Sequence, residues 1–279
     1  MYIGIFDTSF GGLMGNSYKL DKIKLDKNEA LTKLEAVEVY SAIKKANPNI
    51  KKDVLKLKEE LISGLSRHDR KSGTWFANVY KKVVDNRGKS ITLESLEAAY
   101  NTKNKELIAR KLVAYYCNYG ISIGAVLGSA GGILGLFTAH HATFEELTCL
   151  AYFQICLLYD LSVLYCRPID RANNLEIYRL LKIAFGFNVH ELNDKGMRVI
   201  EEKLLKDDSQ KFLYGLLKNL GAAIVRSSVK NLVSKMVPVI GTLIALVVCT
   251  AEDYKAVRIV AKRSVRFYEN YENMGTFKI

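Results

Sequence analysis

Proline is scarce in this chain, which contains only Pro48, Pro168 and Pro238 among its 279 residues. Because proline removes a backbone donor and clashes with the preceding helical turn, this scarcity leaves long segments free to form helices. No segment alternates apolar and polar residues between turn residues at strand spacing, so we expect no β-sheet. The sequence therefore predicts an all-α protein, and its 49 % of hydrophobic residues are sufficient for a packed core.

Signatures of common enzyme classes are also missing. The chain has no Gly-x-Ser-x-Gly motif, and its glycine-rich segment lacks the Lys-Ser/Thr pair of a phosphate-binding loop. The five cysteines form no Cys-x-x-Cys pair. Cys117 and Cys249 lie in apolar surroundings, which raise the pKa of a thiol and oppose its use as a nucleophile. We expect no enzymatic activity, no cofactor, and the reduced thiols of a cytosolic protein without a secretory signal.

Charge is absent from the middle of the chain. Residues 112–144 contain no Asp, Glu, Lys or Arg, although the whole chain carries a net charge of +12. The basic excess lies in the flanks, with +6 over residues 61–111, +4 over 167–230 and +3 over 231–279. Basic flanks suit an anionic lipid surface or a nucleic acid, and a solvated helical surface explains them equally well.

Glycines recur at four-residue spacing within the uncharged run, at Gly120, Gly124, Gly128 and Gly132, and Gly135 belongs to a second, offset pair. Positions four apart lie on one face of an α-helix, so we expect a bare face that another helix approaches closely. Each glycine in a helix interior costs about 1 kcal/mol relative to alanine. Several glycines in one helix therefore require close packing in return.

This run predicts the first helix of an apolar hairpin, residues 114–138, packed against a second over 143–166 and closed by a helix that follows Pro238. Between them we expect a break at 138–142, with Thr143 and Glu146 spaced as a capping box. The run reaches the length of about 20 residues that a membrane span needs. Its glycine, serine and alanine content and the charge of Asp160 favour a soluble core instead.

Asp160 is the only charged residue in the second apolar helix after its first turn. A buried carboxylate must be paired, hydrogen-bonded or protonated. Tyr159, Tyr165, Arg167 or a basic residue of another helix are the candidate partners. A structural pair or an exposed position explains Asp160 more simply than a proton or ligand site does. The acidic pair Glu252 and Asp253, further along, is interpreted as surface charge.

A cluster of potential zinc ligands surrounds the predicted break, at His140, His141, Glu145, Glu146 and Cys149. His141, Glu145 and Cys149 are four residues apart and share one helix face. The two histidines fall in the break, however, and Glu146 is assigned to capping. We therefore expect local polarity here and no metal site.

Basic residues line one side of the predicted C-terminal helix, at Lys255, Arg258, Lys262 and Arg266. A helix of this kind suits an anionic membrane surface or another anionic partner. A second basic group, Arg67 to Lys71, precedes Trp75 and has the composition of a nucleic-acid contact. A loop rich in solvated charge explains that group equally well, and we do not expect nucleic-acid binding.

The segment GAVLGSAGGILGLFTAHHATFEELTCLAYFQICLLYDLSVLY resembles the central hairpin of the EcsC family. The later segment KMVPVIGTLIALVVCTAEDYKAVRIVAKRSVRFYE resembles the family's C-terminal block, with Pro238, Gly241 and Tyr268 at matching positions. The resemblance covers roughly residues 81–270. It implies a helical protein with a membrane-linked or regulatory function and supplies no catalytic residues.

Together these features predict a helical bundle around a glycine-rich apolar hairpin, with residues 1–80 as an N-terminal helical extension and 81–279 as an EcsC-like domain. We expect a non-enzymatic protein associated with the cytosolic face of a membrane, in contact with membrane lipids or a membrane-protein complex. The alternatives are a soluble module that regulates a larger complex and a membrane-disrupting effector. A metal enzyme at His140, His141 and Glu145 is the weakest alternative.

Overall fold

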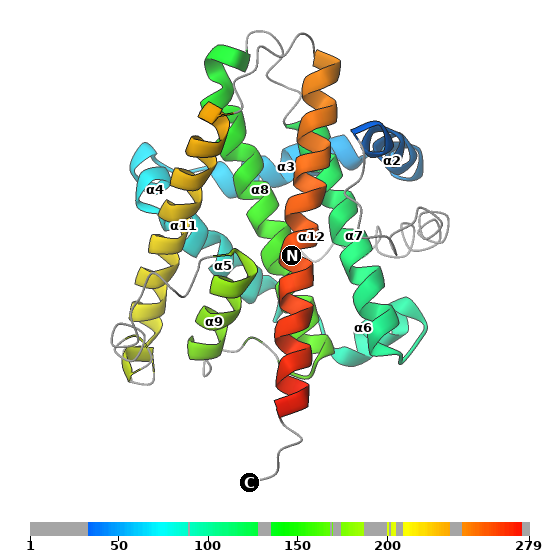
Figure 1. Cartoon of the computed structure of the whole chain (residues 1–279), viewed down its shortest axis with the longest axis vertical. Helices are drawn as coiled ribbons and strands as arrows, with labels where there is room; N and C mark the ends of the chain where they lie inside the picture. Colours follow the sequence, from blue (N-terminus) through cyan, green and yellow to red (C-terminus); the bar gives the residue numbers. More distant parts are fainter. Residues whose placement is uncertain are drawn as a thin grey trace. The chain divides into compact units, whose positions relative to one another are not determined.

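Every regular element in the described part of the chain is an α-helix, which confirms the predicted all-α class (Figure 1). The computed structural model describes residues 33–88, 90–127, 135–167, 169, 174–186, 200, 202–204, 209–234 and 242–274. Within these ranges the side chains of 33–37, 135–143, 227–234, 242–250, 252 and 271–274 are not described. The helices are α2 (Lys33–Ala46), α3 (Ile50–Ile62), α4 (Arg67–Ser72), α5 (Thr74–Arg87), α6 (Leu93–Tyr100), α7 (Lys105–Val126), α8 (Gly135–Leu164), α9 (Asn174–Ala184), α11 (Ser209–Ser234) and α12 (Thr242–Met274).

Side-chain caps explain where several helices begin. At α6 the hydroxyl of Thr92 accepts a 3.1 Å hydrogen bond from the backbone N–H of Ser95. The Ser95 hydroxyl in turn accepts from the backbone N–H of Thr92 at 2.9 Å, which completes a capping box. Ser66 and Asp69 make the same exchange at α4, where the sequence indicated a loop. Asn104 caps α7 by accepting from the Leu107 N–H at 3.0 Å.

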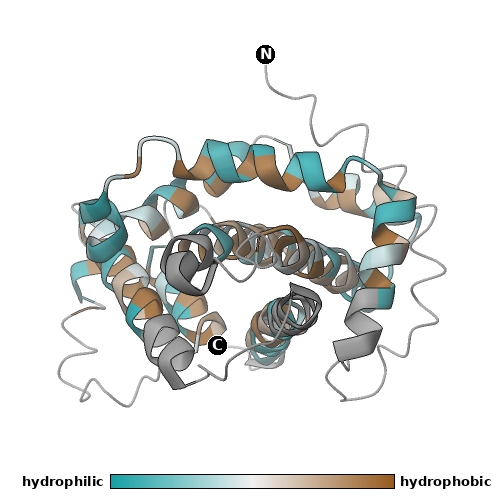
Figure 2. Ribbon diagram, turned by 90° about the horizontal axis from the view of Figure 1, so that it is seen from above, coloured by the Kyte–Doolittle hydropathy of each residue, from teal (hydrophilic) through white to brown (hydrophobic). Residues whose placement is uncertain are grey.

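Most described helices carry hydrophobic residues along one side and hydrophilic residues along the other (Figure 2). The buried residues recur at helical spacing, as expected for amphipathic helices that pack on a core. In α3 these are Ile50, Val54, Leu57 and Leu61. In α5 they include Trp75, Phe76, Val79 and Val83.

The chain forms two compact units, and each combines segments that are distant in the sequence. The first unit contains α2, α3, α6, α7, α8 up to Phe153 and α12 up to Arg258. The second contains α4, α5, α9, α11 and the remaining parts of α8 and α12. Residue 80, where the sequence analysis placed a boundary, lies inside α5.

In the first unit α7 is the central helix and packs against α2, α3 and α6. It also contacts α8, because the ring of Tyr119 stacks on Phe153 with 4.3 Å between the ring centroids. In the second unit α11 packs against α4, α5 and α9. Tyr165 after α8 stacks on Tyr268 of α12 with 5.3 Å between the centroids, which joins these two elements.

Two predictions about the central hairpin are wrong in detail. α7 starts at Lys105 and ends at Val126, so it does not extend over 114–138. α8 begins at Gly135 and passes through 138–142, where a break was expected. The reason is local, since residues 138–142 contain neither glycine nor proline and nothing there stops a helix. Thr143 therefore lies inside α8 and does not cap it, while residues 128–134 are outside the described residues.

Candidate functional site

A glycine of α7 sets the position of α12 in the first unit. A Cβ atom added to Gly120 would lie 3.0 Å from Cγ2 of Val257 and 3.1 Å from the backbone oxygen of Asp253. Alanine at this position therefore requires the Val257 side chain or the backbone at Asp253 to give way by a few tenths of an ångström. Gly124, one turn further along α7, is also buried. Gly128 and Gly132 lie outside the described residues, and of Gly135 only the helical backbone is described.

One side of α12 is buried along the helix. Its buried residues recur at helical spacing: Asp253, Tyr254, Val257, Val260, Ala261, Ser264, Phe267 and Tyr268. The Ser264 hydroxyl is satisfied inside the helix because it donates to the Val260 carbonyl at 2.7 Å. The polar residues between these positions are consequently directed away from the core.

Basic residues occupy that outward side. Lys255, Lys262 and Arg266 are exposed. Within the described residues none of the three has an ion pair or a hydrogen bond of its side chain. Arg258 is only partly exposed, since its Nη1 donates to the hydroxyl oxygen of Tyr254 at 3.3 Å. Between residues 254 and 268 the chain has five basic residues and no acidic one. In the sequence, the nearest acidic residues are Glu252, Asp253 and Glu269, which lie just beyond the two ends of this stretch, so the positive charge is concentrated between them.

Two carboxyl groups meet on the inner side of α12, in the first unit. Glu146 of α8 is hydrogen-bonded to Asp253, which is 8 % exposed. Burial raises the pKa of Glu146 to about 7, and the hydrogen bond to Asp253 opposes this shift. A hydrogen bond between two carboxyl groups requires one proton, so the pair retains a proton up to nearly neutral pH. The predictions of surface charge at Asp253 and of a capping role for Glu146 are wrong.

The buried acid pair has a consequence for stability. The folded protein keeps a proton on Glu146 that the unfolded chain releases near its ordinary pKa of 4.5. The free energy of unfolding should therefore fall as the pH rises from about 4.5 to about 7. The fall should amount to about 1–3 kcal/mol, since one pKa unit corresponds to about 1.4 kcal/mol and the residue is partly exposed. Urea unfolding at a series of pH values measures it.

The matched variants for that experiment are Glu146→Gln and Glu145→Gln. The amide at position 146 can still donate to Asp253 but cannot ionise, so the pH dependence should flatten and stability at pH 8 should rise. Glu145 is the adjacent residue on the same helix, and its replacement should leave the profile in place. A profile that keeps its slope in Glu146→Gln would contradict this assignment.

Beside the acid pair, Glu145 forms an ion pair with Lys58 of α3, with 3.1 Å between Nζ and Oε2. Cys149, one turn along α8, is buried, and burial raises the pKa of its thiol to about 12. A zinc ligand must be a thiolate, which this environment opposes. Among the described side chains no three His, Cys, Asp or Glu residues lie close enough together to hold a metal ion. His140 and His141 belong to α8, but their side chains are not described.

Burial also raises the pKa of the Cys117 thiol to about 12, which confirms the effect expected from its apolar surroundings. Cys249, the other cysteine of that prediction, has no described side chain. The aromatic residue that follows the basic group Arg67 to Lys71 is also enclosed, because Trp75 is fully buried and its ring packs edge-on against Phe76. Trp75 is therefore not available for stacking on a base.

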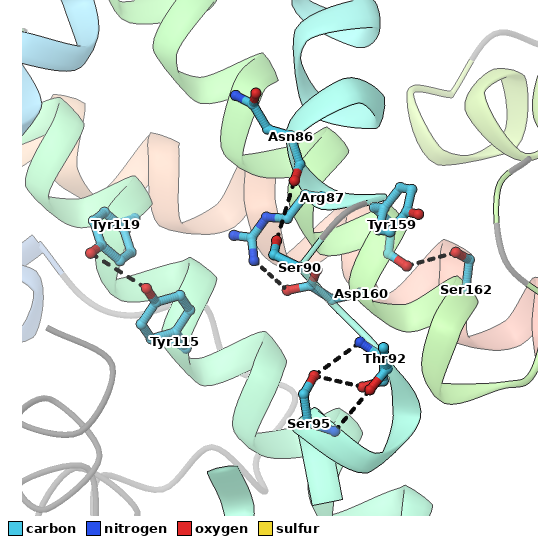
Figure 3. A network of polar contacts seen from close by, with 10 residues as sticks. All are labelled: Asn86, Arg87, Ser90, Thr92, Ser95, Tyr115, Tyr119, Tyr159, Asp160 and Ser162. Carbon is cyan, nitrogen blue, oxygen red and sulfur yellow. Dashed lines mark hydrogen bonds and ion pairs between the residues drawn. The ribbon is translucent and has the colours of Figure 1, made fainter. Parts of the chain in front are cut away.

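In the second unit Asp160 is fully buried and pairs with Arg87, the last residue of α5 (Figure 3). The distance between Nη1 of Arg87 and Oδ2 of Asp160 is 3.5 Å, and the arginine side chain is only 8 % exposed. Of the candidate partners, the basic residue from another helix is the one observed. The turn after α5 is held by the Ser90 hydroxyl, which donates to the Asn86 carbonyl at 3.2 Å.

Helical periodicity in the sequence already indicates that members of both pairs are buried. Arg87 continues the buried spacing of Val79 and Val83 at intervals of four, so its position on α5 is an inward one. Asp253 lies four residues before Val257 and thus on the buried side of α12. In both cases the charged residue was assigned by its type, whereas its place in the periodicity indicated burial.

One helical segment of the described chain, Phe144–Leu164, is long and apolar enough to cross a membrane, and 94 % of its most apolar window is buried in the protein. Core packing thus accounts for its composition. Comparison with known proteins finds no matching family model, no matching curated protein and no matching solved structure. A function for this chain has to follow from its own surface and core.

Proposed function

We propose that this protein is a non-enzymatic, peripheral membrane protein that binds anionic lipid at the cytosolic face through the basic side of α12. The observation that supports this proposal most directly is the run from residue 254 to 268, with five basic residues and no acidic one. Lys255, Lys262 and Arg266 are exposed there, on a helix whose other side is held in the core. A basic helix face near an anionic bilayer gains about 1 kcal/mol per lysine or arginine.

The binding is peripheral because the most apolar helix is already used inside the protein. Moving Phe144–Leu164 into lipid would disrupt the contacts that bury it. It would also separate Asp160 from Arg87 and move its carboxyl group toward lipid, which costs further free energy. We also propose that this chain is a member of the EcsC family. The resemblance of its hairpin and C-terminal block to that family implies a membrane-linked or regulatory function.

Vesicle binding tests this function. The protein should sediment with vesicles of mixed phosphatidylcholine and phosphatidylglycerol and remain in solution with phosphatidylcholine alone. Binding should weaken strongly as salt is added, because salt screens exposed charges. Reversal of three charges in Lys255→Glu, Lys262→Glu and Arg266→Glu should reduce the affinity about a hundredfold or more.

The control reverses three exposed lysines on a single helix elsewhere, Lys51→Glu, Lys52→Glu and Lys56→Glu on α3. Both triple variants lower the net charge by the same amount, so a specific role for α12 requires the control to bind clearly better. An equal loss of affinity in both variants would mean that net charge alone drives the binding. Absence of binding to either vesicle would reject the membrane function in favour of a soluble regulatory module, and leakage of trapped dye would favour the effector.

A further inference from the structure

Large hydrophobic side chains are seldom exposed in the described part of the chain. Four of them are between 37 % and 41 % exposed, namely Leu107, Ile183, Tyr214 and Ile259. Tyr214 directs its hydroxyl to Asn78 Oδ1, to which it donates at 3.0 Å. Ile183 and Ile259 have no polar atom on their side chains, and both belong to the second unit.

Arg263 links the two helices that carry these isoleucines. Its Nη1 donates to the carbonyl oxygen of Ala184 at 3.3 Å, at the C-terminal end of α9. Ile183 is the residue just before that carbonyl, and Ile259 lies one turn before Arg263 on α12. Figure 1 shows α9 beside the red, C-terminal half of α12. The guanidinium of Arg263 thus connects the end of α9 that carries Ile183 to the turn of α12 that begins at Ile259.

The surroundings of this pair are basic. Lys262 and Arg266 are exposed on the same part of α12, and Arg263 is exposed apart from its contact with α9. A guanidinium at the C-terminus of a helix also offsets the negative end of the helix dipole, which keeps Arg263 in place. The result is a surface with two isoleucines and three cations.

We propose that Ile183 and Ile259, framed by Lys262, Arg263 and Arg266, enter an anionic bilayer just below its headgroups while the three cations contact the lipid phosphates. This inference rests on the proposed function and deepens it by assigning the part of α12 that inserts. A free phosphate or an acidic protein would engage the cations without any need for two aliphatic side chains in water. A bilayer offers both an anionic layer and an apolar one beneath it.

Depth labelling tests the insertion directly. A nitroxide is attached to Ile183→Cys or Ile259→Cys in a protein whose exposed Cys166 is replaced by serine. The Cys166→Ser protein without an added cysteine gives the background signal. On vesicles of phosphatidylcholine and phosphatidylglycerol, both labels should gain access to oxygen and lose access to a water-soluble nickel chelate. A label at Ser63→Cys, an exposed polar position of the same unit, should stay accessible to the chelate.

Affinity gives a second readout that needs no label. Replacing both isoleucines with serine should weaken binding to the anionic vesicles about tenfold or more and leave its salt dependence unchanged. Leu107→Ser, which removes an equally exposed leucine from the first unit, should have no effect. Binding that persists while both labels stay accessible to the chelate, or that ignores the serine variants, would overturn the insertion and leave the proposed function standing. No vesicle binding by the wild-type protein would overturn both.

Discussion

Replacement of Gly73 with alanine should destabilise the protein by about 3–5 kcal/mol, because two separate penalties meet at this residue. Gly73 joins α4 to α5 with a φ of +76°, in the left-handed region that favours glycine. A Cβ there would also collide with backbone atoms of α11, the oxygen of Lys218 and the nitrogen of Ala222. Helical backbone cannot move aside as a flexible side chain can. Urea unfolding of the purified variant measures the loss.

α11 also has a glycine where it meets this turn, so the contact can be tested by a second variant on α11. A Cβ at Gly221 of α11 would lie 2.6 Å from Cβ of Phe76 and 2.7 Å from the backbone oxygen of Gly73. Gly221→Ala should therefore cost about 1–3 kcal/mol, even though alanine is the better helix former.

Two other glycines serve as matched controls. Gly64 has a φ of +82° but no atom within 4 Å of the added Cβ, so Gly64→Ala should show the backbone penalty alone. Gly215 lies on α11 with no such neighbour, and Gly215→Ala should stabilise the protein by roughly 0.5–1 kcal/mol. If Gly73→Ala costs no more than Gly64→Ala, α11 is not pressed against this turn.

Arg87→Met should destabilise the protein by about 3–5 kcal/mol, since it removes the guanidinium from a fully buried carboxylate. Asp160 must then either keep an uncompensated charge in the core or bind a proton, and both cost free energy. The double variant Arg87→Met with Asp160→Leu removes both charges and should recover most of the loss, because well-packed apolar residues often replace a buried ion pair without penalty. Denaturant unfolding of the wild type, the double variant and the two single variants, Arg87→Met and Asp160→Leu, gives the coupling energy.

The surface pair between Lys58 and Glu145 is the control for this cycle. Both side chains are about a quarter exposed, at 28 % and 26 %, so water and salt screen their attraction. Lys58→Met should cost no more than about 1 kcal/mol. A similar cost for Arg87→Met would mean that water reaches Asp160 and would contradict the burial of the pair.

Helix faces and caps were the features that local reasoning predicted best. Val54, Leu57 and Leu61 are three and four residues apart, which places them on one side of a helix, and they form the buried side of α3. Thr92 caps α6, because a threonine at that point can reach the free amide of the first turn. These features depend on residues within one or two turns of each other, and such distances are set by the helix itself.

The break in the hairpin was predicted incorrectly for a related reason. The spacing of Thr143 and Glu146 predicts a break at 138–142, and α8 continues through it. Capping-box spacing has meaning only where a helix actually begins. The residues before and after Thr143 have good helical propensity, so the helix continues there in spite of the capping-box spacing.

The sequence by itself determined the all-α class, the inward and outward sides of the helices, and the basic row of α12, because helical periodicity relates neighbours three and four residues apart. Only the tertiary structure decided which helices meet. It brought Arg87 to Asp160, Glu146 to Asp253 and Gly73 to Gly221. A periodic pattern marks a residue as buried, but it carries no information about the residue on the other helix. That choice depends on the packing of the whole chain.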